Sequence, residues 1–150
     1  MNAAIRVFVP SDAAALSVGA EAVAQALAAE VSTRRLDIAL VRNGSRGLFW
    51  LEPLVEVATP QGRLGFGPVS ACDVPGLIDA GLLDPARGFA TAHPLALGLV
   101  EAMPYLAGQQ RLTFARCGII DPFSIAEYEA HGGLAGLRRA LAMVPAAVVE

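Results

Sequence analysis

The stretch Val-Arg-Asn-Gly-Ser-Arg-Gly-Leu-Phe-Trp-Leu-Glu-Pro-Leu-Val, residues 41–55, organises this chain. It leaves an apolar run at Val41, turns through Gly44 and Gly47, carries the only tryptophan, and becomes extended again after Pro53. Glycines at such a turn supply the positive φ angles that other residues avoid. The turn therefore either holds a ligand or only redirects the backbone.

The residues before this turn predict a strand, a helix and a second strand. Residues 4–9 form a short apolar run that predicts a strand. Over 13–31, apolar residues recur every three or four positions, which predicts one amphipathic helix. The aliphatic run at 37–41 is typical of a strand covered on both faces. A helix of this length predicts a right-handed crossover between two parallel strands.

The residues after the turn predict a hairpin and a helix. Alternation over 54–59 and a second run at 63–66 flank Pro60-Gln61-Gly62, which indicates an antiparallel hairpin. Residues 70–82 read as a helix capped by Ser70 or Asp73. The predicted class is therefore α/β, with a thioredoxin-like domain over residues 1–83.

The sequence pattern changes beyond residue 83. Residues 84–113 read as a linker, with a short helix expected at 95–103 before Pro104. Residues 114–150 are expected to be helical. Within this range, Ser124 and Glu127 have the spacing of a capping box that starts a helix. This helix is expected to end at a glycine pair. A helix over 134–143 is expected to bury three leucines, Leu134, Leu137 and Leu141. Residues 145–150 read as the start of a helix, so we expect the natural protein to continue.

Composition narrows the possible partners and compartment. The net charge of −3 argues against nucleic acid, which usually requires a clustered basic face. No apolar run reaches the roughly 18 residues of a membrane helix and no signal peptide is recognisable, so we expect no membrane partner and a cytoplasmic location. Cys72 and Cys117 are expected to be buried thiols, since two cysteines alone cannot complete a four-ligand metal site.

Several residues are candidates for a binding or catalytic role. Gly44-Ser45-Arg46-Gly47 offers backbone N–H groups and a cation to an anion, or is simply a tight turn. Phe49 and Trp50 stack on a ligand, or anchor a core or an interface. Glu52 and Glu56 read as a solvated face of one strand rather than a general acid/base pair.

The two histidines and a pair of arginines offer little more. His93 lies in the linker, and His131 is expected near a helix C-terminus, where a cation is favourable. Arg138 and Arg139 are expected on an exposed helix surface. The chain therefore contains no self-sufficient active site, and no catalytic, cofactor-binding or metal-binding residue is assigned from the residues alone.

The wording of residues 44–57 resembles a known loop. In thioredoxin-like [2Fe-2S] ferredoxins, and in related domains of NADH-oxidising flavoprotein subunits, the corresponding turn carries two cluster cysteines before Pro-Leu-Val. The resemblance places Ser45 and Phe49 at those two positions, and Pro10 and Ala15 near the first pair. Because iron in such a cluster is held by thiolates, the resemblance implies a domain that binds no cluster.

A second resemblance covers residues 114–134, which are similar to the start of the flavoprotein subunit shared by respiratory complex I, bidirectional hydrogenases and NAD-dependent formate dehydrogenases. Together with residues 43–53 and 109–114, this segment most resembles the beta, or diaphorase, subunits of molybdenum-containing NAD-dependent formate dehydrogenases. The resemblance implies that residues 114–150 begin a truncated FMN- and NADH-binding domain.

The resemblance also implies what surrounds the chain. The full-length parent would bind FMN, NAD and a [4Fe-4S] cluster, although no residue here matches the motifs for them. Its partners would be the ferredoxin-like gamma subunit and the molybdenum-containing alpha subunit. The expected contacts with them are Arg46, Phe49 and Trp50. By this interpretation the segment alone has no catalytic activity.

Three alternatives stay open. The chain is a stand-alone, cluster-free interaction module, or its parent is the diaphorase subunit of an NAD-reducing hydrogenase. As a third possibility, residues 44–47 form an anion-binding regulatory site that depends on Arg46.

Overall fold

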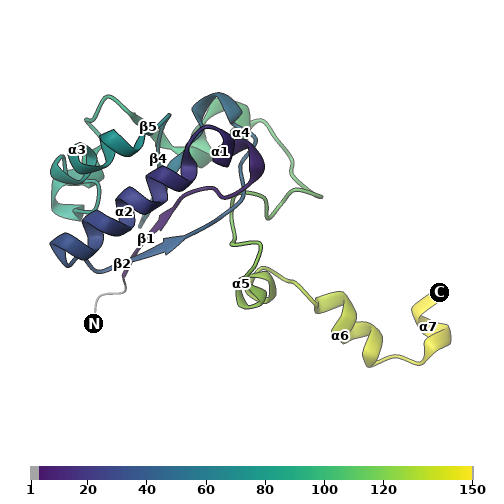
Figure 1. Ribbon diagram of the computed structural model, residues 1–150. Helices are drawn as coiled ribbons and strands as arrows, with labels where there is room; N and C mark the ends of the chain where they lie inside the picture. Colours follow the sequence, from purple (N-terminus) through teal and green to yellow (C-terminus); the bar gives the residue numbers. More distant parts are fainter. Residues whose placement is uncertain (1–3, 150) are drawn as a thin grey trace.

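The computed structural model describes residues 4–149, and its centre is a five-stranded sheet in the order β2-β1-β3-β4-β5 (Figure 1). The strands are β1 (Ile5–Phe8), β2 (Ile38–Val41), β3 (Val55–Thr59), β4 (Gly62–Phe66) and β5 (Ala96–Leu99). β1 and β2 are parallel, whereas β3 and β4 pair antiparallel to their neighbours. The predicted parallel pair and hairpin are therefore confirmed.

β2 differs from the expectation of a strand covered on both faces. It lies at the edge of the sheet, and all four of its residues are only partly buried. Its aliphatic run packs one way against the helix layer, while the other face stays partly open. An all-aliphatic strand can thus occupy an edge, which periodicity alone cannot distinguish from a central position.

The helix predicted over 13–31 is two helices, α1 (Ala13–Ser17) and α2 (Ala20–Arg34). Asp12 caps α1 by accepting hydrogen bonds from the backbone N–H groups of Ala14 and Ala15. The break falls at Gly19, whose φ of 103° a non-glycine residue rarely adopts. The 3.6-residue pattern continued across this break, so periodicity did not reveal it.

The helix expected over 70–82 is present in a shorter form. A 3₁₀ turn, η2 (Ala71–Asp73), leads into α3 (Val74–Asp79). Ser70 and Asp73 form a capping box, in which the Asp73 carboxylate accepts from the Ser70 hydroxyl and backbone N–H. The bond from the Ser70 hydroxyl, together with that backbone bond, lowers the pKa of Asp73.

The helix expected at 95–103 is wrong. After η3 (Pro85–Ala90), the chain forms β5 on the edge of the sheet, and then only the short η4 (Val100–Ala102) and α4 (Pro104–Ala107). The local apolar pattern favoured a helix, but residues 96–99 pair with β4 instead. Gly98, with φ of 81°, also disfavours a helix here. The sheet therefore includes a strand from the range that was predicted as a linker.

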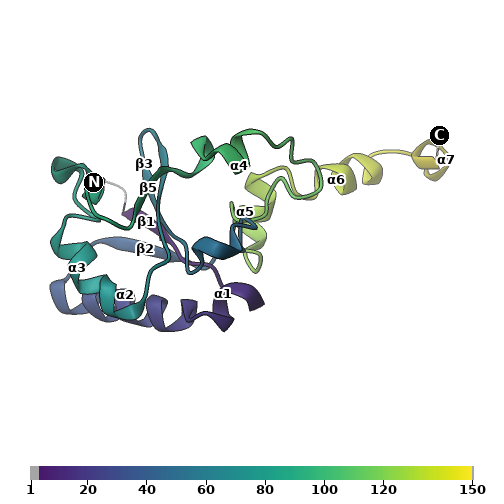
Figure 2. The same cartoon turned by 90° about the horizontal axis from the view of Figure 1, so that it is seen from above.

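Two apolar clusters lie on opposite faces of the sheet. The larger joins strand residues such as Val7, Val57 and Phe66 to α2 and α3 through Leu27 and Leu77. The smaller lies beyond the other face and contains four fully or nearly fully buried residues, Leu48, Leu54, Val100 and Leu106. Figure 2 shows α2 and α3 on one side of the strands and α4 on the other. The loop at 42–54 is packed into this second layer.

The C-terminal part is α5 (Ile125–Ala130), α6 (Ala135–Leu141) and α7 (Pro145–Val149). Ser124 caps α5 as predicted, by accepting from the backbone N–H of Glu127. The expected burial is wrong for Leu137 and Leu141, which are 54% and 78% exposed, whereas Leu134 is partly buried. Figure 1 shows α6 and α7 extending away from the sheet. Glu150 lies outside the described residues. Within 4–149, no helix combines the length and apolar character needed to cross a membrane.

Candidate functional site

The turn at 44–47 is held from within by Arg46. Its guanidinium donates from Nε and Nη2 to the two carboxylate oxygens of Glu56, each at 2.7 Å, and from Nη2 to Glu101 at 3.0 Å. The Arg46 side chain is only 3% exposed. Burial acts to lower the pKa of Arg46, but the bonds and charges of Glu56 and Glu101 outweigh burial and raise it. The Arg46 side chain therefore stabilises the interior of this turn, and little of it is available to an anion or a partner.

Arg63 is a second, partly buried cation in the same network. Its guanidinium lies 3.5 Å from the ring centroid of Phe8 and contacts Glu56 at 3.3 Å. It also donates to the carbonyl oxygens of Gly118 at 3.0 Å and Ile119 at 2.5 Å. Burial lowers the pKa of Arg63, with Glu56 opposing that effect. Arg63 thus connects the sheet to a segment more than fifty residues away in the chain.

Two further bonds fasten that segment to the turn. The Asn43 amide, fully buried, donates to the Gly118 carbonyl at 2.8 Å. Arg111 donates to the Arg46 carbonyl at 3.1 Å. Gly118 has φ of 77°, and a Cβ there would fall on the Arg46 side chain. The backbones meet so closely that only glycine fits at this position.

Glu52 forms a separate buried cluster at the end of the turn. Its carboxylate accepts from the Ser45 hydroxyl and from the backbone N–H of Leu54, both at 2.8 Å. Burial raises the pKa of Glu52, and the two hydrogen bonds only partly oppose this. The expectation of a solvated face for Glu52 and Glu56 is wrong, because they are 6% and 1% exposed. Glu52 ends a 3₁₀ turn, η1 (Phe49–Leu51), whereas Glu56 lies on β3 and faces the arginines.

The outer side of the turn is aromatic. Phe49 and Trp50 are 62% and 61% exposed, and the Trp50 ring meets the edge of Tyr105 at a centroid distance of 5.1 Å. Trp50 is therefore not a core residue within the described chain. Exposed tryptophan and tyrosine are typical anchors of protein interfaces.

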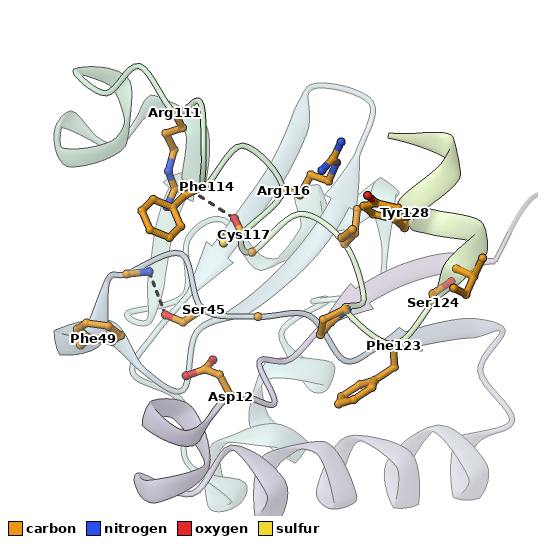
Figure 3. Close-up of a pocket in the computed structure, with 16 residues that line it drawn as sticks. Asp12, Ser45, Phe49, Arg111, Phe114, Arg116, Cys117, Phe123, Ser124 and Tyr128 are labelled. Carbon is orange, nitrogen blue, oxygen red and sulfur yellow. Dashed lines mark hydrogen bonds between the residues drawn. The ribbon is translucent and has the colours of Figure 1, made fainter. Parts of the chain in front are cut away.

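A groove of about 960 Å³ separates the turn from the segment at 111–128 (Figure 3). Ser45 and Phe49 lie on one side, with Asp12 below them and Arg111 and Phe114 above. The other side carries Ile120, Phe123, Ile125 and Tyr128. The sequence had not suggested that these segments meet.

The residues at this loop do not fit an iron–sulfur cluster. The Ser45 hydroxyl is engaged with Glu52 and with the backbone N–H of Gly47, and Phe49 offers no ligand atom. Ala15, near the expected position of another ligand, is buried in the main core. Across residues 4–149, no group of three or more histidine, cysteine or carboxylate side chains is placed to hold a metal.

The structure also places the two cysteines, His131 and Arg138. Cys72 and Cys117 are both exposed free thiols, so the expected burial is wrong. Cys117 lines the groove, whereas Cys72 lies on η2. His131 caps the C-terminus of α5, and its Nδ1 lies 2.8 Å from the Glu127 carbonyl oxygen. Arg138 is exposed, as expected, and pairs with Glu129 at 2.9 Å.

Comparison with solved structures identifies the fold. Three structures of the thioredoxin-like [2Fe-2S] ferredoxin from Aquifex aeolicus match: the wild type and two cysteine-to-serine variants. The wild type has a TM-score of 0.51 at 21% identity, and the two variants have TM-scores of 0.51 at 22% and 0.52 at 21%. Each match covers 63% of this chain and 97–98% of the ferredoxin. No family model and no curated protein matches the sequence.

At this level of identity the likeness establishes the fold alone. The chain contains an α/β domain of the thioredoxin-like class, as the order of its elements predicted. The loop at 42–54 has a buried ionic network inside, an exposed aromatic pair outside, and a groove beside them.

Proposed function

We propose that this chain is the N-terminal docking region of the diaphorase subunit of an NAD-dependent formate dehydrogenase in the cytoplasm. In this proposal the parent passes electrons from formate through iron–sulfur clusters and FMN to NAD, and the chain itself performs no redox step. The thioredoxin-like ferredoxin fold supports descent from an electron-transfer module. The resemblance of residues 114–134 to the start of a flavoprotein subunit supports the parent.

The observation that carries the proposal is the attachment of residues 111–119 to the turn at 43–47. Asn43, Arg63 and Arg111 all donate to backbone carbonyls across this junction. One buried amide, Asn43, and two partly buried cations, Arg63 and Arg111, thus hold a segment that is distant in the sequence. A rigid junction here would fix the position of whatever follows residue 119 relative to the thioredoxin-like sheet.

The partners proposed for the docking region are the gamma and alpha subunits. Phe49 and Trp50 are proposed as direct contacts, because they are the exposed aromatic residues of the turn. Arg46, expected from the sequence to reach a partner, contributes indirectly in this proposal by holding the turn in shape through Glu56.

Co-production tests the proposal. The tagged chain is produced together with the alpha and gamma subunits of a molybdenum-containing formate dehydrogenase from the same genome, and the purified material is measured by native mass spectrometry. We expect a stable complex that contains the chain and at least one of the two subunits. Recovery of the chain alone, in the presence of folded alpha and gamma subunits, would reject the docking role.

The exposed apolar side chains of α6, α7 and the turn between them favour a larger parent over a stand-alone module. Leu141, Val144 and Val149 are 78%, 68% and 88% exposed. A parallel co-production with the subunits of an NAD-reducing hydrogenase distinguishes the two electron sources, because only the true assembly should retain the chain.

A further inference from the structure

The groove between the turn at 44–49 and the segment at 111–128 carries two cations without a charged partner. Arg111 donates to the carbonyls of Arg46 and Cys117, and Arg116 donates to the carbonyl of His131. Within residues 4–149, neither guanidinium lies within ion-pair distance of a carboxylate, whereas Arg46 and Arg63 in the neighbouring network both do. Each retains donors that could bind a carboxylate.

The remaining surface of the groove is apolar and open. Phe114, Phe123 and Ile125 are 63%, 88% and 69% exposed, and Phe49 closes one end at 62%. Figure 3 shows Arg111 and Phe114 on one wall, Phe123 and Tyr128 on the other, and Asp12 at the base. Apolar patches bordered by charged residues mark sites where another molecule binds.

We propose that this groove binds a peptide segment of another protein in which acidic side chains alternate with large apolar ones. The carboxylates pair with Arg111 and Arg116, and the apolar side chains cover Phe114 and Phe123. The inference deepens the proposed docking function, because it names the surface and the chemistry of the partner. Charge complementarity selects an acidic occupant.

The test uses a fluorescein-labelled peptide of repeating Glu-Leu-Phe units and measures its binding to the purified chain by fluorescence anisotropy. Two matched peptides replace Glu by Lys, or Leu and Phe by Ala. We expect saturable binding of the acidic apolar peptide only. Binding of the Lys peptide with equal affinity, or no binding of the Glu peptide, would overturn the proposal.

Variants locate the binding on the chain. Arg111→Glu combined with Arg116→Glu should weaken the peptide by at least about 10-fold. Arg35→Glu makes one of the same charge changes at the far end of α2 and should leave affinity unchanged. Because the arginines also contact backbone carbonyls, Phe114→Ala with Phe123→Ala is the second test. Both side chains are exposed, so their removal leaves no cavity, and the same weakening is expected. Leu137→Ala on α6 is the matched control. Unchanged affinity in both double variants would overturn the proposal.

Two other occupants are outcomes of the same experiment. FMN that displaces the peptide and binds more tightly would make the groove a small-molecule site instead. A homodimer in native mass spectra that the Phe114 and Phe123 variants dissociate would assign the groove to a second copy. The peptide assay needs no formate dehydrogenase subunit. Failure of co-production therefore counts against the proposed function, and failure of the peptide counts against the groove.

Discussion

Arg46 and Glu56 form a two-point ion pair in the interior of the second layer, with both N···O distances at 2.7 Å and side-chain exposures of 3% and 1%. The arginine comes from the turn and the glutamate from the centre of β3, so the pair fixes the turn directly to the sheet. Arg63, from the adjacent strand, shares the same carboxylate and passes the connection on to Gly118 and Ile119. The shape of the turn and the position of residues 116–120 therefore depend on one buried carboxylate.

The ion pair can be measured by a double-mutant cycle. Arg46→Met leaves Glu56 buried with a weaker partner, and we expect it to lower the free energy of unfolding by about 3–5 kcal/mol. Adding Glu56→Leu removes the stranded charge, so the double variant should lose less than the sum of the single losses, by at least about 1 kcal/mol. Urea unfolding followed by circular dichroism gives the values. Simple additivity would mean that the two groups are not coupled.

Gly118 and Gly132 separate backbone conformation from close contact. Both have positive φ, at 77° and 80°, but only at Gly118 would a Cβ strike a neighbour, the side chain of Arg46. We expect Gly132→Ala to cost about 1 kcal/mol, and Gly118→Ala to cost about 1–3 kcal/mol more because it overpacks the junction. Limited proteolysis should then cut Gly118→Ala within residues 109–120 faster than it cuts Gly132→Ala. Equal cleavage of the two would show that residues 116–120 do not pack on the turn.

Glu52 makes stability depend on pH. Burial raises its pKa above the ordinary value of 4.5, so the folded chain binds the proton more tightly than the unfolded chain does. Its stabilising contribution is therefore full below about 4.5 and is lost as the pH rises through the raised pKa. In Glu52→Gln this loss should disappear because an amide does not titrate, and the amide can still accept from Leu54 and donate to Ser45. Denaturation at a series of pH values compares the slopes, and identical slopes in the two proteins would place Glu52 in contact with water.

Trp50 should matter for binding more than for stability. Its contact with Tyr105 is exposed, so Trp50→Ala should cost only about 0.5–1.5 kcal/mol in unfolding free energy. If the turn docks on another subunit, the same change should weaken the complex by at least about 10-fold, as for an interface hot spot. Surface plasmon resonance with the alpha and gamma subunits measures the effect. An exposed residue away from the turn, Gln61→Ala between β3 and β4, is the control and should leave binding unchanged.

The sheet and its crossover could be predicted because each depends on local patterns. The aliphatic runs at 4–9 and 37–41, the alternation over 54–59 and the capping signals at Ser70 and Ser124 all act within a few residues. The fifth strand could not be predicted, since Ala96–Leu99 becomes a strand only by pairing with β4. Its isolated sequence suits a helix equally well, and tertiary pairing overrode that preference.

The ionic network inside the site could not be predicted from the sequence for a related reason. Glu56 alternates with Val55 and Val57, a pattern typical of a strand with one wet face. Its true surroundings come from Arg46, Arg63 and the 116–120 segment, which are brought together only by the fold. One signal was available: arginine at 46 and 63 on either side of a glutamate in adjacent extended segments. The sequence marks Phe49 and Trp50 as residues that stack on a ligand or anchor a core or an interface, and the structure adds that both are exposed.

In the proposed function, the loop at 42–54, which resembles a cluster-binding turn, serves protein contact instead of iron. Anaerobic reconstitution of the purified chain with ferrous iron and sulfide, followed by desalting and iron analysis, tests it most directly. Because Ser45 is tied to Glu52 and Phe49 offers no ligand atom, we predict a colourless protein with far less than one iron per chain. Two irons per chain with visible charge-transfer absorbance, retained after desalting, would contradict the claim.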